Sequence, residues 1–332
     1  MVRRAENEGY FKIVGYNWTM TPYCPEFGAC LLNKGRVPVK TAVQAEFEER
    51  ISLEDAVTVI IKTANRLGVT KRLVESIFQF YENLKIIVVD EANPELLRRN
   101  ESFRKEYDEW RHYTSTTRGK VYYIQVQKDA GISHGRNVGL FIVRTKYFLL
   151  LDDDMIFDKE TNIRKLKELL DHTNLVVVGG FIRENRIKLA INGIFRVHAD
   201  QFNVLRTYIN EYQLMAYDRV RCYPECYVVD AISNFFLART DAILDVGGWD
   251  VKLRVGEHRD FMLTLRKNNY PVAVCTDVII EHFPPNLDLR KKAQKVIKDV
   301  YKDMFLHKWN ISNSFACRSI RSKAYYEYRC KP

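Results

Sequence analysis

Three consecutive carboxylates, Asp152-Asp153-Asp154, directly follow the apolar run Tyr147–Leu151. Like charges at this spacing repel each other, and the end of a buried strand is partly desolvated, so we expect a cation to offset them. Oxygen ligands suit a hard divalent ion such as Mn²⁺ or Mg²⁺, and a diphosphate would complete its coordination sphere. An isolated triplet is more often a helix cap with solvated neighbours. The buried strand before it and the acidic strand end at Asp90 favour the metal interpretation here.

Two further groups of titratable side chains could take part in chemistry. The segment Gly256–Asp260 opens an expected helix over about residues 259–267. A carboxylate at its start is ionised at neutral pH and can act as a general base, although a favourable interaction with the helix N-terminus alone explains such an acid better. His282 ends the strand Val278–His282. A metal ligand is one role for a histidine there, and a surface or hydrogen-bonded histidine is the commoner one.

An alternation of strands and helices must position these groups. Continuous apolar runs predict buried strands at Val57–Ile61, Ile86–Val89, Val121–Val126, Tyr147–Leu151 and Leu175–Val178. Helical spacing of apolar residues predicts helices around Leu73–Phe80 and Ile163–Leu170, and a glycine-punctuated stretch, Gly131–Gly139, opens a short one. This order predicts an α/β fold with a doubly wound sheet. Ligands of such sheets bind at the carboxyl ends of the strands, where Asp90 and the triplet fall.

The composition is that of an ordinary globular protein with an anionic partner. The 332 residues have a formal net charge of +10, which suits nucleic acid, a membrane surface or a small phosphorylated substrate. The basic residues are scattered, with short clusters such as Arg290-Lys291-Lys292, so nucleic-acid binding is disfavoured. We find no apolar run near the roughly 18–20 residues of a membrane helix and no signal peptide. Taken literally, these features predict a soluble protein.

Seven cysteines and three glycosylation sequons favour an oxidising compartment. The close pairs Cys24/Cys30 and Cys222/Cys226 lie in loop-like sequence, as disulfides of such a compartment would. The sequons begin at Asn17, Asn100 and Asn310 and point weakly the same way, since such tripeptides are common by chance. The odd count leaves at least one thiol free or available for an intermolecular bond.

Taken in order, these segments resemble the family-2-like glycosyltransferases with the GT-A fold. The matching segments are Val57–Ile61 as the first strand, Val88-Val89-Asp90 as the uridine-contacting strand end, Gly135-Arg136-Asn137 before the central strand, and Asp152-Asp153-Asp154 as the metal (DXD) motif. The resemblance implies an α/β fold with a single Rossmann-like sheet, mixed and mostly parallel, flanked by helices.

A narrower resemblance rests above all on the segment Asn234–Asp241. The other matching segments are Lys62-Thr63, Thr145-Lys146-Tyr147, Val177–Gly180, Val246-Gly247, His258, Asp260-Phe261 and Cys275–His282. With these segments, the chain resembles the β-1,4-N-acetylgalactosaminyltransferase family, which includes the ganglioside-synthesising enzyme, over about residues 55–285. We therefore expect an irregular leader (residues 1–50), a catalytic domain (51–290) and a C-terminal extension (291–332). The catalytic domain would have a nucleotide-sugar-binding half (51–180) and an acceptor-binding half (181–290).

The resemblance also implies roles for particular residues. Asp154, with Asp152 and His282, would hold a Mn²⁺ (or Mg²⁺) bound to the diphosphate of a UDP-sugar. The other nucleotide-sugar contacts would be Lys62, Thr63, Asp90, Glu91, Arg136, Asp152 and Asp153, the last facing ribose or donor sugar. Asp260, where the family has a glutamate, would be the general base of an inverting single displacement, with Glu257 as the alternative. Acceptor contacts would come from Asn234, Trp249 and His258.

We accordingly expect transfer of N-acetylgalactosamine from UDP-GalNAc to a hydroxyl of a glycolipid or glycoprotein. Three alternatives stay open: another UDP-sugar (galactose or GlcNAc), a catalytically silent carbohydrate-binding relative, and a polyanion-binding protein. The family's members are usually type II membrane proteins of the Golgi, which implies the Golgi lumen or the secretory pathway. The chain shows no anchor, so we expect a truncated form, an incomplete gene model or a soluble relative. A homodimer is compatible with the sequence.

Overall fold

The computed structural model describes residues 51–184, 187–189, 193–198, 204–209, 219–284, 300–321 and 326–331, with side chains for 51–184, 219–284 and 300–314. The expected leader, the Cys24/Cys30 pair and the sequon at Asn17 lie outside these residues. Among the helices of the described ranges, none is long and apolar enough to cross a bilayer.

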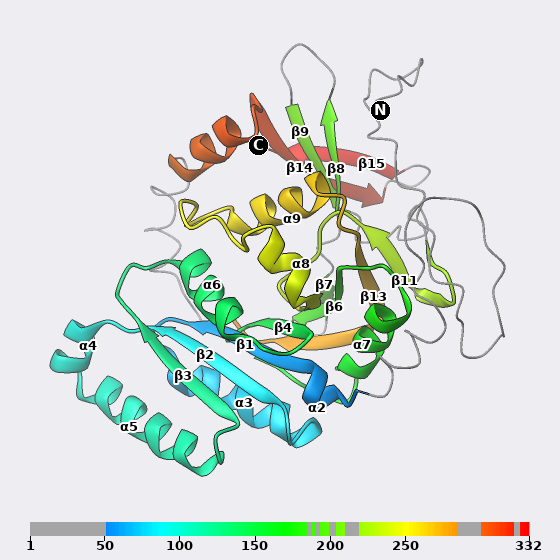
Figure 1. The fold of residues 1–332 in the computed structure, drawn as a ribbon. Coiled ribbons are helices and arrows are strands. Elements are labelled where there is room, and N and C mark those ends of the chain that lie inside the picture. The colour runs from blue at the N-terminus through cyan, green and yellow to red at the C-terminus, as the bar shows by residue number, and fades with distance from the viewer. Residues whose placement is uncertain are drawn as a thin grey trace.

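A parallel group of four strands forms the first half of the central sheet (Figure 1). Its order is β4 (Tyr147–Asp152), β1 (Val57–Thr63), β2 (Lys85–Glu91) and β3 (Val121–Val126). All four strands were predicted from their apolar runs. Their carboxyl ends lie together, because Lys62 pairs in register with Asp152 and Thr63 with Asp90.

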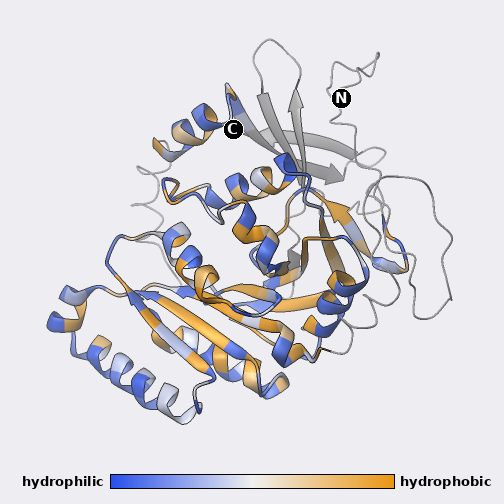
Figure 2. Ribbon diagram, in the orientation of Figure 1, coloured by the Kyte–Doolittle hydropathy of each residue, from blue (hydrophilic) through white to orange (hydrophobic). Residues whose placement is uncertain are grey.

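Helices cover both faces of this half, which is why its inner strands β4, β1 and β2 are apolar on both sides. In β1, Val59 and Ile61 pack into one core cluster with residues of α3 (Leu67–Phe80), whereas Ile60 packs into the other with Leu140 of α6 (Ile132–Ile142). Figure 2 shows the hydrophobic strands between more hydrophilic helices. The remaining elements here are α2 (Leu53–Ala56), α4 (Pro94–Arg99), α5 (Glu101–Thr116), β5 (Met155–Ile156) and α7 (Ile163–His172).

Antiparallel pairings enter in the second half, which makes the sheet mixed. The order continues from β4 through β12 (Phe236–Arg239), β6 (Val177–Glu184), β13 (Val272–His282) and β11 (Tyr223–Val229) to β10 (Arg219–Val220), with β7 (Ile187–Leu189) beside β6. β13 is parallel to β6, and its last residue, His282, pairs with Met155 of β5 just after the triplet. The helices are α8 (Thr240–Asp245), α9 (Glu257–Lys267) and one over residues 300–308. The expected α/β class with a mixed sheet flanked by helices is confirmed.

A second sheet joins segments that are distant in the sequence. It has the order β15 (Tyr326–Lys331), β14 (Asn313–Arg321), β9 (Val204–Ile209) and β8 (Gly193–His198). β14 is parallel to β9, so part of the expected C-terminal extension pairs with part of the expected acceptor-binding half. The functional division of the chain into halves stays a prediction.

The cysteine pairing differs from the expectation. Cys226 forms a disulfide with Cys275, and Cys222 is also disulfide-bonded, so the predicted Cys222–Cys226 pair is wrong. The reason is strand register: Cys226 on β11 lies directly opposite Cys275 on the antiparallel β13, with 4.0 Å between their Cα atoms. Closeness in sequence did not give the partner, because Cys226 lies within the extended strand β11, where strand order and register set which residue it meets.

Candidate active site

The acidic triplet lies at the carboxyl end of β4, as predicted. Asp153 is buried, accepts a 2.6 Å hydrogen bond from Thr63 Oγ1 and pairs with Arg66. Burial raises the pKa of Asp153 to about 6, against the opposing effect of Arg66. The pKa of Asp154 is also pushed upward by burial, but the hydrogen bond and charge of His282, aided by Arg66, bring it below its usual value. The neighbouring carboxylates therefore have different environments.

Asp152 is held by Arg136 and Asn234, which are not partners of the other two carboxylates of the triplet in these contacts. Its Oδ1 accepts from Arg136 at 3.2 Å and its Oδ2 from Asn234 at 3.1 Å. Arg136 is buried in α6 and also donates to Glu257 Oε1 at 3.0 Å. Arg136 therefore links the triplet to the start of α9, rather than extending into the space in front of the strands.

His282 lies beside Asp154, as expected if the two side chains hold the same ion. Its Nε2 is 3.3 Å from Asp154 Oδ1, and its Nδ1 is 2.8 Å from Glu184 Oε2. The hydrogen bond to Asp154 is the main cause that raises the pKa of His282 to about 9, with Glu184 adding to it. A carboxylate oxygen suits Mn²⁺, and a neutral imidazole nitrogen is a common ligand of metal ions, so the two side chains fit the implied ion.

The carboxylate of Asp152, the expected third ligand, does not converge with the ligand atoms of Asp154 and His282. Among the described residues, three or more metal-binding side chains converge only at Cys226, Cys275 and Asp277, and those cysteines are joined in a disulfide. An ion at this place would have Asp154 and His282 as its side-chain ligands and would need further oxygen ligands from a bound molecule or water.

Proton competition at His282 leads to a prediction. The pKa of about 9 means that the folded, metal-free protein loses the stability contributed by this proton as the pH rises from about 6.5 through 9. Mn²⁺ needs the neutral ring, so its affinity should increase over the same range by up to about tenfold per pH unit. Titrations of Mn²⁺ at several pH values test this. His282→Asn should flatten the slope, and an equal slope in both proteins would contradict the prediction.

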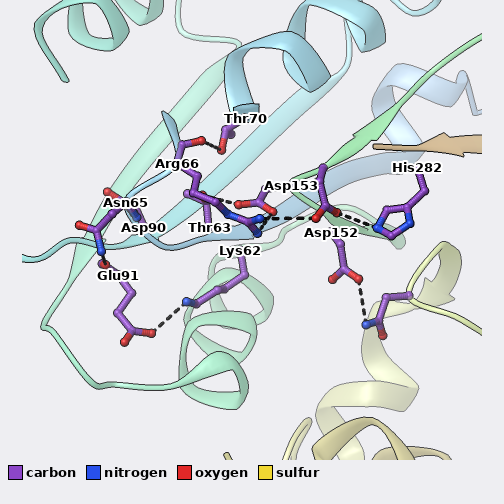
Figure 3. Close-up of polar contacts among 12 residues, drawn as sticks. Lys62, Thr63, Asn65, Arg66, Thr70, Asp90, Glu91, Asp152, Asp153 and His282 are labelled. Carbon is purple, nitrogen blue, oxygen red and sulfur yellow. Dashed lines mark hydrogen bonds and ion pairs between the residues drawn. The ribbon is translucent and has the colours of Figure 1, made fainter. Parts of the chain in front are cut away.

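Arg66 is a basic residue of this site that was not predicted. It precedes α3 in the loop after β1, and its guanidinium contacts Asp153 and, at 3.5 Å, Asp154 (Figure 3). Its Nε is buried and has no hydrogen-bond partner among the described residues. The sequence did contain a signal, since a basic residue that follows a strand end beside an acidic triplet is well placed to offset its charge.

Asp90 and Glu91 organise the loops around the site. Asp90 is fully buried: Oδ1 accepts from the Asn65 backbone and Oδ2 from the hydroxyls of Tyr107 and Tyr123. Burial and Asp90 raise the pKa of both tyrosines, so they remain neutral donors. Both oxygens of Asp90 therefore already have protein partners, although the sequence suggested that Asp90 contacts the nucleotide.

Glu91, the next residue, also accepts hydrogen bonds from the loops around the site. It accepts from Lys62 at 2.9 Å and from the backbone of Asp129 and Gly131. These bonds tie Lys62 to the loop before α6. Close approach of that helix depends on Gly135, because a Cβ there would lie 2.8 Å from Cγ of Lys62. Glu91 and Gly135 together fix the lysine at the edge of the site.

The two carboxylates considered as the general base occupy different environments. Glu257 follows Gly256, whose φ of 81° is left-handed and easy only for glycine, and it begins α9 next to the triplet. Asp260 lies one turn later and is buried, with its oxygens bonded to Lys308 at 2.8 Å and Trp309 Nε1 at 2.8 Å. Asp260 therefore anchors the C-terminal helix 300–308 to α9.

Of the expected acceptor contacts, only Asn234 faces the site. Trp249 is buried, stacks on Phe261 with ring centroids 4.5 Å apart and lies under the Arg136 guanidinium. His258 contacts the Ile232 carbonyl through Nε2, and burial lowers its pKa, so the ring is neutral. Trp249 and His258 thus lie outside the cavity wall and pack against residues of the site. Their roles toward an acceptor stay predictions.

A cavity of about 450 Å³ connects these groups. Its walls are Lys62, Thr63, Ala64, Arg66, Ile132, Asp152, Asp153, Asp154, Asn234, Arg254, Val255, Glu257 and His282. The cavity is thus lined by the whole triplet, His282 and Glu257. It is not lined by Asp90, Glu91, Arg136, Asp260, Trp249 or His258. The structure thus brings together eight of the fourteen expected site residues around one polar cavity.

The sequence of this domain matches the family model described as glycosyl transferase family 2 over residues 58–226. The chain belongs to this family. The chain is 31% identical over 237 residues to beta-1,4 N-acetylgalactosaminyltransferase 1 of Mus musculus, and 30% identical over 232 residues to that of Homo sapiens. Each match covers 68% of this chain and 38% of the relative, so the chain spans well under half the length of these relatives. The resemblance to N-acetylgalactosaminyltransferases seen in the sequence is confirmed.

A solved structure, that of S. aureus TarS residues 1–349, is also similar. The comparison gives a TM-score of 0.45 and 17% sequence identity, and the match covers 68% of this chain and 60% of that chain.

Proposed function

We propose that this protein transfers N-acetylgalactosamine from UDP-GalNAc to a glycan hydroxyl with inversion, and that it requires Mn²⁺. The observation that carries the proposal is that Asp154, His282 and Glu257 line one cavity. The first two are suited to an ion that holds a diphosphate, and the third is a carboxylate suited to accept a proton. The similarity to N-acetylgalactosaminyltransferases supports the choice of donor.

Glu257 is the proposed general base. The acceptor oxygen attacks C1 of the donor sugar, Glu257 takes the hydroxyl proton, and the bond from C1 to the diphosphate oxygen breaks to release UDP. One displacement inverts the configuration at C1 and needs no covalent intermediate. Arg136 fixes Glu257 through its 3.0 Å bond and balances its charge before the proton moves. We prefer Glu257 to Asp260 because Asp260 is buried against Lys308 and Trp309.

The charged groups around the cavity suit the diphosphate of the sugar donor. When bound, Mn²⁺ would offset the negative charge that develops on the departing diphosphate. Asp154 and His282 would hold that ion, and Arg66 would turn its free hydrogen-bonding capacity toward the phosphates. Asp153, hydrogen-bonded to Thr63, faces the same cavity and is the proposed contact for ribose or donor sugar.

Arg66 can be tested with ligands of graded charge. Arg66→Gln should weaken UDP binding by about 10–100-fold, as loss of a hydrogen bond between charged groups does, while binding of uridine stays nearly unchanged. Calorimetric titrations with UDP, UMP and uridine measure the difference, and Arg254→Gln on the same cavity wall is the control. Equal losses for UDP and uridine would show that Arg66 supports the fold of the site instead.

The proposed activity is tested with a panel of donors. Purified protein with Mn²⁺ is incubated with UDP-GalNAc, UDP-GlcNAc and UDP-galactose, and UDP release is measured with and without glycan acceptors. We expect UDP-GalNAc to be used fastest. Faster use of another UDP-sugar would show that the proposed donor is wrong. Binding of a glycan without UDP release from any donor would indicate a catalytically silent carbohydrate-binding relative.

A further inference from the structure

Glu184 ends β6 beside the end of β13, where His282 lies. The two strands are parallel, and Arg183 pairs in register with Glu281, so Glu184 is adjacent to His282. His282 uses both ring nitrogens: Nδ1 is 2.8 Å from Glu184 Oε2, and Nε2 is 3.3 Å from Asp154 Oδ1. One nitrogen thus faces the cavity carboxylate, and the other faces a carboxylate outside the cavity wall.

We propose that Glu184 is a positioning residue for the metal site, which accepts the Nδ1 proton of His282 and so leaves Nε2 to the ion. The inference rests on the proposed function, because it assumes the ion beside Asp154. A neutral imidazole has one protonated nitrogen, and a carboxylate acceptor at Nδ1 selects the tautomer in which Nε2 carries the lone pair. Such a carboxylate also restrains the ring plane and makes the ligand nitrogen more basic.

The surroundings of Glu184 keep it in this role. Its neighbour Arg183 binds three other carboxylates: Glu281, Glu160 at 2.5 Å and Asp158 at 2.6 Å. That cluster ties the ends of β6 and β13 to the loop after β5. Because successive residues of a strand point to opposite faces, Arg183 fixes the backbone from one face while Glu184 meets His282 on the other.

The orientation of the ring is fixed at its backbone as well. His282 pairs with Met155 of β5, and the next residue, Phe283, donates its backbone N–H to the Asp154 carbonyl at 2.8 Å. The backbone next to His282 is thus hydrogen-bonded to the backbone of Asp154. With the backbone fixed, the remaining freedom of His282 is rotation of its ring, which is what the Glu184 contact limits.

A double-mutant cycle on metal binding tests this inference without turnover. The proteins are wild type, Glu184→Ala, His282→Ala and the double variant, and free Mn²⁺ is followed by electron paramagnetic resonance with saturating UDP present. Measurements at about pH 8 and about pH 9 separate proton competition at His282 from the effect on the ligand itself. We expect Glu184→Ala to weaken Mn²⁺ binding by about 10–100-fold, and to have no effect once His282 is absent.

Two further variants control for folding and charge. Glu184→Gln keeps an acceptor oxygen for Nδ1 and should lose less affinity than Glu184→Ala. Glu281→Gln changes a neighbouring carboxylate that pairs with Arg183, and it should leave Mn²⁺ affinity nearly unchanged. Thermal unfolding of every variant shows whether a change in affinity comes with a loss of structure.

The outcomes distinguish this inference from the proposed function. If His282→Ala leaves Mn²⁺ binding intact, the proposed metal site itself is wrong. If His282→Ala weakens binding but Glu184→Ala does not, the role of Glu184 is overturned while the metal site stands. An equal effect of Glu184→Ala with and without His282 would also overturn it, since Glu184 would then act by charge alone.

Discussion

Replacing Glu257 by glutamine is expected to lower kcat for sugar transfer by about 10²–10⁴-fold, with UDP affinity nearly unchanged. Glutamine keeps the shape and can still accept from Arg136, but it cannot take the proton of the acceptor hydroxyl. Steady-state kinetics with UDP-GalNAc and a glycan acceptor give kcat, and calorimetry with UDP and Mn²⁺ gives the affinity.

The matched control for this experiment is Asp260→Asn. Asp260 is buried and bonded to Lys308 and Trp309, so its change should mainly lower the midpoint of thermal unfolding. A full loss of transfer in correctly folded Asp260→Asn, together with an active Glu257→Gln, would restore Asp260 as the base.

Replacing Arg136 by methionine is expected to lower the free energy of unfolding by about 3–5 kcal/mol, since it removes the partner of two carboxylates at a buried site. The guanidinium is 1% exposed and bonds both Asp152 and Glu257. Urea unfolding curves measure the loss. The variant should also lose transfer activity, because both the triplet and the proposed base would be less well positioned.

Arg254→Met is the comparison for this prediction. Arg254 lines the same cavity but is exposed, so its change should alter stability by at most about 0.5 kcal/mol. Equal stability losses in the two variants would show that the bridging contacts of Arg136 contribute little to the fold.

The sheet and the triplet could be predicted because their signals are local. Strands buried on both faces give continuous apolar runs, and the triplet directly follows one of them. The helix α5 gave no such signal, because only Tyr107 and Trp110 of its residues are buried. The sequence therefore did not show that Tyr107 covers Asp90, and Asp90 was expected to meet the nucleotide.

Long-range pairings explain most of the other differences. The contact of Glu184 with His282, the disulfide between Cys226 and Cys275, and the pairing of β9 with β14 each join residues far apart in sequence. Each depends on strand order and register, which apolar patterns do not determine by themselves. The preference for Glu257 over Asp260 likewise needed the position of Lys308, 48 residues after Asp260.

The central claim is that the acidic triplet, with His282, holds a metal ion that binds the nucleotide diphosphate. Calorimetric titration of UDP with and without Mn²⁺, on wild type and on Asp154→Ala, tests it most directly. We predict that Mn²⁺ strengthens UDP binding in wild type and does not strengthen it in Asp154→Ala. UDP binding that is independent of Mn²⁺ and equal in the two proteins would contradict it.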